Sequence, residues 1–291
     1  MNTEGENMEQ QWSYAIQPKT KWYDFKLKEL WKYRDLVWLF VKRDFTTRYK
    51  QTILGPAWFI VQPLLIAAMQ AFVFHDIAHI DMPAEGVSHF LFYMISNVPW
   101  LYFSNCLTAT SGTFVDNVNL YGKVYFPRLA LPISTVITSM INFFVQLLLV
   151  GFFSIIFLWR GSNARVTWVA ALTPLFLLEM ALLGLGFGII ISSLTTKYRD
   201  LRVVVNFGVS LWMYATPVIY AASFLWNKPF LYRLIMLNPL SPIVELMRYG
   251  WIGVGSQPWL WWGISWLTTF VVLFIGVTMF NRVEKTFMDT V

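Results

Sequence analysis

The sequence predicts an all-α polytopic membrane protein with six transmembrane helices and both termini in the cytoplasm. Six long stretches carry almost no charge, and hydrophobic residues make up 57% of the 291 residues against 13% charged residues. Each stretch is long enough to cross a hydrocarbon core, which takes about 20 apolar residues in a helix. The expected spans are approximately 54–74, 90–114, 133–159, 166–194, 203–223 and 259–280.

The distribution of basic residues sets the expected orientation, because cytoplasmic loops retain Lys and Arg. Seventeen of the 22 basic residues lie in residues 1–53, in the loops 116–133 and 197–202, or after residue 281. The other side receives five, so we expect a multi-pass protein of a bacterial plasma membrane. These basic residues sit beside span ends, where they can meet anionic lipid headgroups, and no nucleic-acid partner is expected.

The N-terminal region divides into a flexible arm, residues 1–21, and an amphipathic interfacial helix, residues 22–50. The arm is polar and lacks the apolar core of a cleavable signal. Helical periodicity then places an apolar stripe on one face, with basic residues and tryptophans suited to the headgroup region. A helix that binds a soluble partner is the alternative. The stripe comprises Leu27, Leu30, Trp31, Trp38, Val41 and Phe45.

Two features inside the spans carry information. Glu179 is the only ionisable residue well inside an expected span. An intramembrane carboxyl suggests a proton, ion or substrate contact, and the alternative is a structural role with a hydrogen-bond partner on a neighbouring helix. Gly184, Gly186 and Gly188 in the same span are spaced so that a neighbouring helix can approach closely.

We predict that residues 224–252 form a re-entrant exit segment. It is too apolar for a solvated loop, and its apolar pieces of about 10 to 14 residues are too short to span. Backbone groups freed by prolines must be paired within the protein or face water. We therefore place Asn238, Pro239 and Pro242 in the exit segment and a cytoplasmic tail at 283–291.

The sequence offers little for enzyme chemistry. A phosphate-binding loop needs a Gly-Lys pair followed by Ser or Thr, but here Gly122 and Lys123 precede Val124. We therefore expect no catalytic residue and no cofactor in this chain. His75 and His79 have the i, i+4 spacing of a metal pair, but no accompanying ligand motif supports it, and no metal site is predicted.

Several motifs together resemble one family. The stretch KRDFTTRYKQTILGPAWFIVQPLL, residues 42–65, is similar to the start of the first span in permease subunits of ABC exporters for O-antigen, capsular polysaccharide and teichoic acid. The likeness extends over most of residues 42–282. It continues through NLYGKVYFPRLALP at 119–132, KYRDLRVVVNF at 197–207, TPVIY at 216–220 and NPLSPIVELMR at 238–248.

This resemblance implies a homodimer that encloses a channel for a polyprenyl-linked polysaccharide. It also implies two copies of a separate ABC ATPase subunit, which would use ATP and Mg, docked on the cytoplasmic face. A coupling loop at 116–132 would contact the ATPase, together with the loop that follows the fourth span. Headgroup anchoring is the alternative for Lys123 and Arg128. The implied coupling residues are Asn119, Tyr121, Lys123, Tyr125, Phe126, Arg128, Arg199 and Asp200.

Aromatic residues make up 18% of the chain and provide candidate liners of the substrate path. Aromatic faces can stack on sugar rings, whereas lipid-facing rings in interfacial belts are the simpler interpretation. The candidates near the ends of the first two spans are Trp58, Phe59, Tyr93, Trp100, Tyr102 and Phe103, with Glu179 as a possible polar contact.

Three functions from different classes follow. The favoured one is an ATP-driven polysaccharide exporter permease. The second is an exporter of drugs or small amphiphiles with the same fold. The third is a membrane scaffold or a secondary carrier, and the isolation of Glu179 disfavours the carrier because no other buried charge in the expected spans could relay a proton.

Overall fold

The structure, a computed structural model, describes residues 27–50, 55–80, 86–121, 126–196, 198 and 200–290. Every regular element in these ranges is helical, as predicted. The long helices are α2 (Arg34–Tyr49), α3 (Trp58–Ala71), α4 (His89–Ser111), α7 (Ala130–Trp159), α8 (Thr173–Thr195), α9 (Leu201–Tyr214), α11 (Leu240–Ile252) and α12 (Trp259–Thr290). The predicted arm, residues 1–21, lies outside the described residues.

Short elements connect these helices. Gly55–Ala57 and Trp168–Leu172 form 3₁₀ turns that lead into α3 and α8, and Phe72–Ile77 continues α3 as a π-helix. The remaining elements are α1 (Leu27–Lys32), α5 (Thr113–Asp116), α6 (Val118–Tyr121), a 3₁₀ turn at Ala222–Leu225 and α10 (Pro229–Met236).

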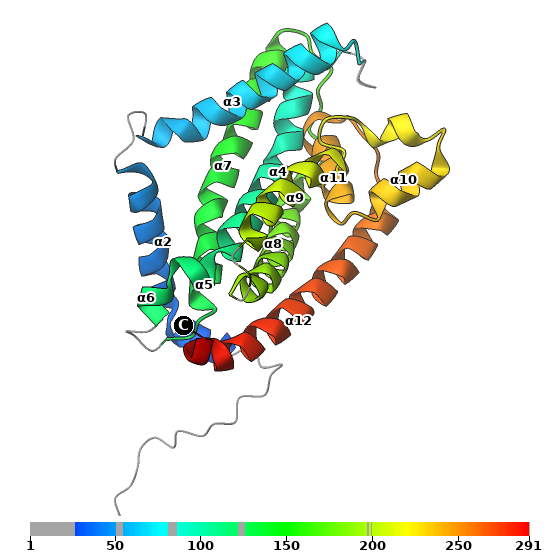
Figure 1. The fold of residues 1–291 in the computed structure, drawn as a ribbon. Coiled ribbons are helices and arrows are strands. Elements are labelled where there is room, and N and C mark those ends of the chain that lie inside the picture. The colour runs from blue at the N-terminus through cyan, green and yellow to red at the C-terminus, as the bar shows by residue number, and fades with distance from the viewer. Residues whose placement is uncertain are drawn as a thin grey trace, which may run out of the picture.

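Helices α4, α7, α8 and α12 form the central bundle (Figure 1). Helix α8 packs between α4 and α12, and its glycines allow this close approach. A Cβ atom at Gly184 or Gly188 would lie 2.7 Å or 2.4 Å from a side chain of α4, and one at Gly186 would lie 3.1 Å from the backbone of α12. The predicted close packing of these glycines is confirmed.

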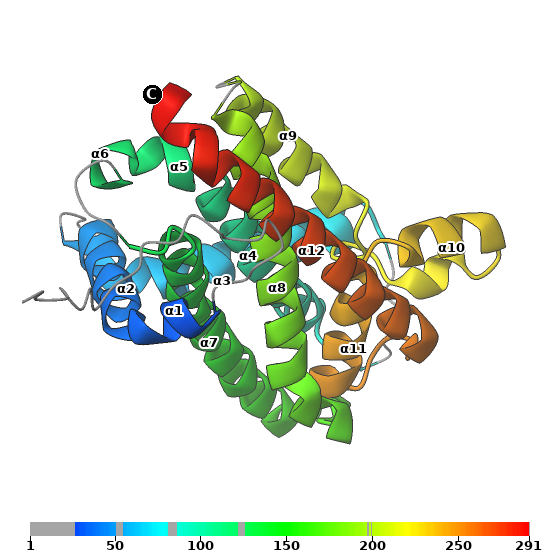
Figure 2. The same ribbon diagram turned by 90° about the horizontal axis from the view of Figure 1, so that it is seen from below.

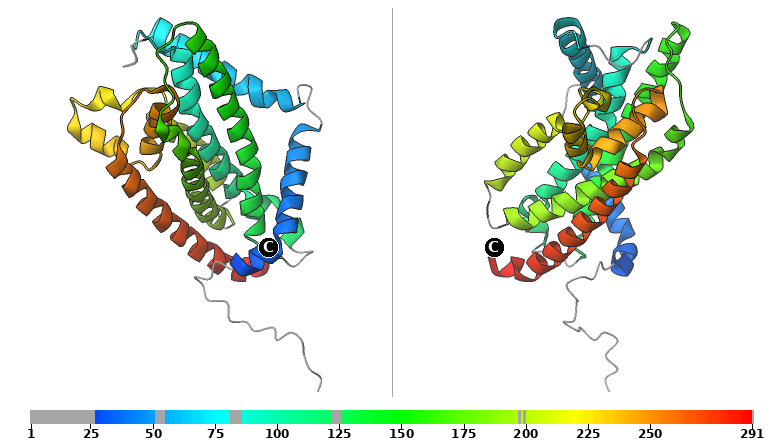
Figure 3. Two further views of the ribbon diagram at one scale, coloured as in Figure 1. Left: turned by 180° about the vertical axis from the view of Figure 1, so that it is seen from behind. Right: turned by 90° about the vertical axis from the view of Figure 1, so that its right-hand side faces the viewer.

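The bundle has two ends. We call the end where α5, α6 and the last turns of α12 lie the basal end, and the end with α10 and the bend before α11 the distal end (Figure 1). Helix α12 runs obliquely between the two ends (Figure 3). Viewed along the bundle, α2 and α10 lie on opposite sides of α8 and α12 (Figure 2).

Four helical segments in the described part of the chain are long and apolar enough to cross a membrane: Trp58–Ile77, Ala130–Trp159, Trp168–Thr195 and Trp259–Val283. A fifth arises if α10 and α11, which are bent by 93°, count as one broken span. The chain is therefore a multi-pass membrane protein, but length and composition do not confirm the predicted six spans.

Helix α4 is not among these four segments because it is too polar, although it has 23 residues. It contacts α3, α7, α8 and α11, and sixteen of its residues are buried. A helix enclosed by other helices has no need of a lipid-compatible surface, so Asn97, Ser104 and Asn105 are tolerated there. Protein burial accounts for the low hydropathy that distinguishes α4 from the outer helices.

Helix α9 ends earlier than the predicted span 203–223. It has 14 residues and stops at Tyr214, two residues before Thr216 and Pro217. A proline disfavours helical geometry at the residue before it and provides no backbone N–H. The remaining stretch to Tyr220 is irregular, so α9 alone is shorter than a span.

The described part of the predicted interfacial helix 22–50 forms α1 and α2, which are separated by Tyr33; residues 22–26 lie outside the described residues. Its buried side matches the predicted stripe only in part. Leu30, Phe40 and Val41 are buried, whereas Trp31 and Trp38 are exposed by 72% and 66%. Because α2 packs along α7 (Figure 3), the aliphatic side chains and Phe40 face the bundle, and the two tryptophans remain available for headgroups.

Candidate functional site

An aromatic cluster holds the basal end together. We call Phe40, Phe114, Tyr121, Phe126 and Phe280 the basal aromatic cluster; they come from α2, α5, α6, the segment after α6, and α12. The ring centroids are 5.6 Å apart for Phe40 and Phe126, 5.6 Å for Tyr121 and Phe126, 5.7 Å for Phe114 and Tyr121, and 4.5 Å for Phe114 and Phe280. The segment that follows α4 is thereby fixed to the N-terminal and C-terminal helices.

Arg128 covers this cluster. Its guanidinium carbon lies 5.6 Å from the centre of the Tyr121 ring, within cation–π range. The Tyr121 hydroxyl donates a hydrogen bond to the backbone carbonyl of Arg128 over 3.3 Å. The two sides of the coupling loop are therefore linked to each other.

The structure places the predicted coupling residues in different environments. Tyr121 and Phe126 are 4% and 5% exposed, so they hold the coupling loop in place and offer little side-chain surface to a partner. Asp200 is exposed at the start of α9. Lys123, Tyr125, Arg199 and the side chain of Asn119 lie outside the described residues. An ATPase contact by the loop stays a prediction.

An ion pair that was not among the predicted site residues joins the two basal loops. Arg202 Nη1 and Nη2 donate to Asp116 Oδ1 and Oδ2 over 2.8 Å and 2.7 Å. The pair crosses the backbone of Gly112, where a Cβ would lie 2.5 Å from Asp116 Oδ2. Asp116 is the only acidic residue between 86 and 178, a signal that could have identified it.

The distal end contains a fully buried ion pair, Glu245 and Arg248 of α11, with both side chains 0% exposed. Arg248 Nη1 donates to Glu245 Oε1 over 2.8 Å, Nε donates to Ser96 Oγ of α4 over 3.0 Å, and Nη2 donates to the Pro217 carbonyl. The interpretation of Glu179 as the one buried charge is therefore wrong. The ion pair was missed because both residues belong to the segment assigned to the exit.

The carboxylate of Glu245 connects two further segments through three hydrogen bonds. Its oxygens accept hydrogen bonds from the backbone N–H of Ala222 over 2.9 Å and of Ser256 over 2.9 Å, and from Ser256 Oγ over 3.1 Å. The guanidinium of Arg248 also lies 4.0 Å from the centre of the Phe92 ring. The pair is thus the centre of a network that joins α4, the TPVIY segment and α11.

The predicted exit residues form the bend between α10 and α11. Asn238 Nδ2 donates to the Ala215 carbonyl over 3.1 Å and to Thr216 Oγ1 over 2.8 Å, while Asn238 Oδ1 accepts from the N–H of Leu240 over 3.2 Å. Pro239 and Pro242 occupy the start of α11, where prolines are tolerated because the first N–H groups have no helical partner. Asn238 therefore connects the bend to the end of α9.

Glu179 is also fully buried, and it has side-chain partners on α12. Trp262 Nε1 lies 2.7 Å from Glu179 Oε2, and Ser265 Oγ lies 2.6 Å from Oε1. These contacts agree with the alternative interpretation, in which Glu179 has a structural role and a hydrogen-bond partner on a neighbouring helix.

The predicted path residues divide into two groups. Trp58 is 43% exposed, and Phe59 stacks on Phe45 with ring centroids 6.1 Å apart. The other four are buried within the chain, at 4% exposure or less. Contact between these four and a substrate requires movement of the surrounding helices, and the lining role stays a prediction. The buried four are Tyr93, Trp100, Tyr102 and Phe103.

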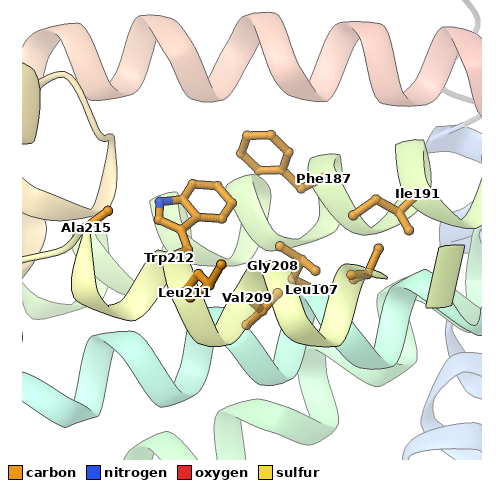
Figure 4. A pocket seen from close by; sticks show the side chains of 9 residues that line it. Leu107, Phe187, Ile191, Gly208, Val209, Leu211, Trp212 and Ala215 are labelled. Carbon is orange, nitrogen blue, oxygen red and sulfur yellow. The ribbon is translucent and has the colours of Figure 1, made fainter. Parts of the chain in front are cut away.

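An open apolar groove of about 450 Å³ lies between α9 and the neighbouring helices α8 and α4 (Figure 4). Phe187 and Trp212 lie at its walls with ring centroids 5.2 Å apart. Helix α9 buries none of its own residues, and Val203, Phe207 and Tyr214 are more than 60% exposed. Helix α9 therefore presents an apolar surface that the described residues do not cover.

Among the described residues, no group of three or more His, Cys, Asp or Glu side chains is placed to hold a metal ion. The ring of His75 stacks on that of His89, with centroids 3.5 Å apart, and His79 lies beyond the π-helix with a φ of 51°.

An all-helical multi-pass bundle with a loop region fixed at its basal end is the architecture of an integral membrane protein, and such a fold hosts many functions. Comparison with known families agrees: residues 35–252 match the ABC-2 type transporter family. Because the match covers well over half of the chain, the chain belongs to this family.

The relatives are more specific. Two O-antigen export system permease proteins RfbA from Klebsiella pneumoniae are each 26% identical to the chain, over 256 and 255 residues, covering 88% of this chain and 94% of each relative. An O-antigen export system permease protein RfbA from Myxococcus xanthus is 30% identical over 222 residues, covering 76% of this chain and 80% of that relative. The similarity therefore extends over nearly the whole length of the Klebsiella proteins.

Proposed function

We propose that the chain is the permease of an ATP-driven exporter that moves a lipid-linked polysaccharide of the O-antigen, capsule or teichoic-acid type across the bacterial plasma membrane. The observation that carries this proposal is the near-full-length similarity to O-antigen export permeases. In this proposal, α3, α4, α7, α8, α9 with the segment to Tyr220, and α12 are the six spans, both termini are cytoplasmic, and α10 and α11 are re-entrant.

The alternative with the same fold is an exporter of drugs or small amphiphiles. Deleting the gene and measuring the surface glycan distinguishes the two. The proposal expects loss of the glycan with accumulation of its polyprenyl-linked form inside the cell, and restoration by the wild-type gene. An unchanged surface glycan together with drug sensitivity would favour the alternative.

In the proposed complex, the basal end docks on two copies of an ABC ATPase that bind ATP and Mg. The basal aromatic cluster supports this role because it links the coupling loop to α2 and α12. Movement of the loop would therefore move long helices as rigid bodies. The pair Asp116 and Arg202 would carry the same movement to α9.

Charge changes at the basal surface test this docking. Asp200→Arg combined with Lys123→Glu is expected to weaken the ATPase complex about tenfold, equivalent to about 1.4 kcal/mol, because both residues belong to the predicted contact and Asp200 is exposed. Copurification of the tagged ATPase with the permease measures the effect. Arg160→Glu, an exposed charge after α7 at the distal end, is the matched control. Equal ATPase recovery from all three proteins would refute the docking assignment.

The proposed homodimer would use the exposed apolar surface of α9 as part of its interface. Its exposed apolar side chains would pack against a second copy. Cys106 is buried, so a single Phe207→Cys change provides one accessible thiol for crosslinking in membranes. We expect a crosslinked dimer from Phe207→Cys and none from the control Phe144→Cys, an exposed residue of α7. Equal yields from both variants would place the interface elsewhere.

A further inference from the structure

Glu179 and Ser265 form a short chain of oxygen atoms with the backbone of the exit segment. Ser265 Oγ of α12 lies 2.6 Å from Glu179 Oε1 of α8 and 2.7 Å from the carbonyl oxygen of Pro239, the residue before α11. Trp262 Nε1 donates to the other carboxyl oxygen, Glu179 Oε2, over 2.7 Å. Three segments far apart in the sequence thus meet at one buried carboxyl group.

The number of protons in this chain is fixed by simple counting. A serine hydroxyl has one proton, and a backbone carbonyl can only accept. Both oxygen–oxygen distances are those of hydrogen bonds, and two oxygens this close repel each other without a proton between them. Two contacts therefore require two protons, of which Ser265 provides one. The indole N–H of Trp262 points to the other carboxyl oxygen and cannot provide the second.

We infer that Glu179 is held as an un-ionised carboxylic acid that donates its proton to Ser265, which in turn donates to the Pro239 carbonyl. Glu179 is then a positioning residue that ties the bend between α10 and α11 to α8 and α12. If the acid lost its proton, Ser265 would turn toward the carboxylate and the Pro239 carbonyl would lose its partner. This inference does not depend on the exported substrate.

The surrounding charges agree with a neutral acid. Arg248 directs its guanidinium to Ser96, Glu245 and Pro217, and Arg202 pairs with Asp116 at the basal end. Helix α7 carries no charged residue. An ionised carboxylate without a cation would be costly in this buried position, whereas the neutral acid satisfies its hydrogen bonds.

Infrared spectroscopy of the purified full-length protein tests the protonation directly. We expect a carbonyl band of an un-ionised carboxylic acid that shifts on deuteration and disappears in Glu179→Gln. Glu245→Gln combined with Arg248→Met, which removes both members of the buried pair, is the matched control and should keep the band, because Glu245 forms an ion pair with Arg248. A wild-type spectrum without this band, or a band that survives in Glu179→Gln, would overturn the inference.

Thermal unfolding provides a second measurement, which tests whether a neutral side chain with the same hydrogen bonds can replace Glu179. A glutamine at position 179 can donate its amide N–H to Ser265 and accept from Trp262, so Glu179→Gln should unfold at the wild-type temperature, whereas Glu179→Ala should unfold at a lower one. An unfolding temperature of Glu179→Gln as low as that of Glu179→Ala would contradict the inference, because a neutral group that donates to Ser265 would then fail to replace the carboxyl group. Adding Ser265→Ala to Glu179→Ala should cause less further loss than Ser265→Ala causes alone.

Discussion

Replacing Arg248 with methionine is expected to destabilise the protein by about 3–5 kcal/mol, because it leaves the Glu245 carboxylate buried without its cation. Both side chains are fully buried, and the guanidinium also satisfies Ser96 and the Pro217 carbonyl. A loss of this size is a large part of the stability of a typical domain. The amount of folded protein extracted from membranes and its unfolding temperature should both fall sharply.

The partner residue and a surface arginine provide the controls for Arg248. Glu245→Gln combined with Arg248→Met should recover part of the loss, since removing both charges removes the unpaired ion. Arg233→Met changes an exposed arginine of α10 and should have little effect. Wild-type stability of Arg248→Met would mean that the buried network does not hold α11 to α4.

Replacing Gly188 with alanine is expected to cost about 1–3 kcal/mol through overpacking between α8 and α4. The added Cβ would lie 2.4 Å from Thr110 Cβ and 2.7 Å from its Cγ2, so the two helices must separate. Gly208→Ala in α9 is the matched control, because no atom outside its own neighbourhood lies within 4 Å of the added Cβ. The unfolding temperature in detergent measures both variants.

A compensating change separates overpacking from other effects at Gly188. Thr110→Gly removes the two nearest atoms that the new Cβ would meet and leaves the Leu107 carbonyl oxygen at 3.2 Å, so the double variant should unfold at a higher temperature than Gly188→Ala alone. If Gly188→Ala and Gly208→Ala behaved alike, close contact between α8 and α4 would not be required. The same result would also weaken the interpretation of the neighbouring Gly184.

The predicted spans followed from hydropathy, and four of them correspond to long apolar helices. The second and fifth predicted spans are the two that hydropathy did not describe correctly. Helix α4 lies where the second span was predicted, but its composition is too polar to identify it as a span. Its enclosure by other helices permits these polar residues. Helix α9 stops at Tyr214 because the Thr216–Pro217 step disfavours helix continuation. Hydropathy describes what lipid tolerates and does not register burial by other helices.

In the coupling loop as well, the sequence indicated one property and the tertiary structure another. Its position between two spans was read from the sequence, whereas the inward orientation of Tyr121 and Phe126 depends on Phe40 and Phe280, which lie far away in the chain. No local pattern in residues 116–132 indicates which rings turn inward. Fewer of the predicted coupling residues are therefore available to contact a partner in the folded protein than the sequence alone indicates.

The sequence by itself determined that the chain is helical, multi-pass and lacking a phosphate-binding loop, because these properties depend on composition and local spacing. Only the tertiary structure decided which polar residues are buried and what satisfies them. Glu245 and Arg248 are two charged residues in a short apolar segment. Arg248 is buried through contacts with Ser96 and Pro217, more than 30 residues away in sequence, and Glu245 through contacts with Ala222 and Ser256. Desolvation depends on neighbours in space, which the order of residues does not specify.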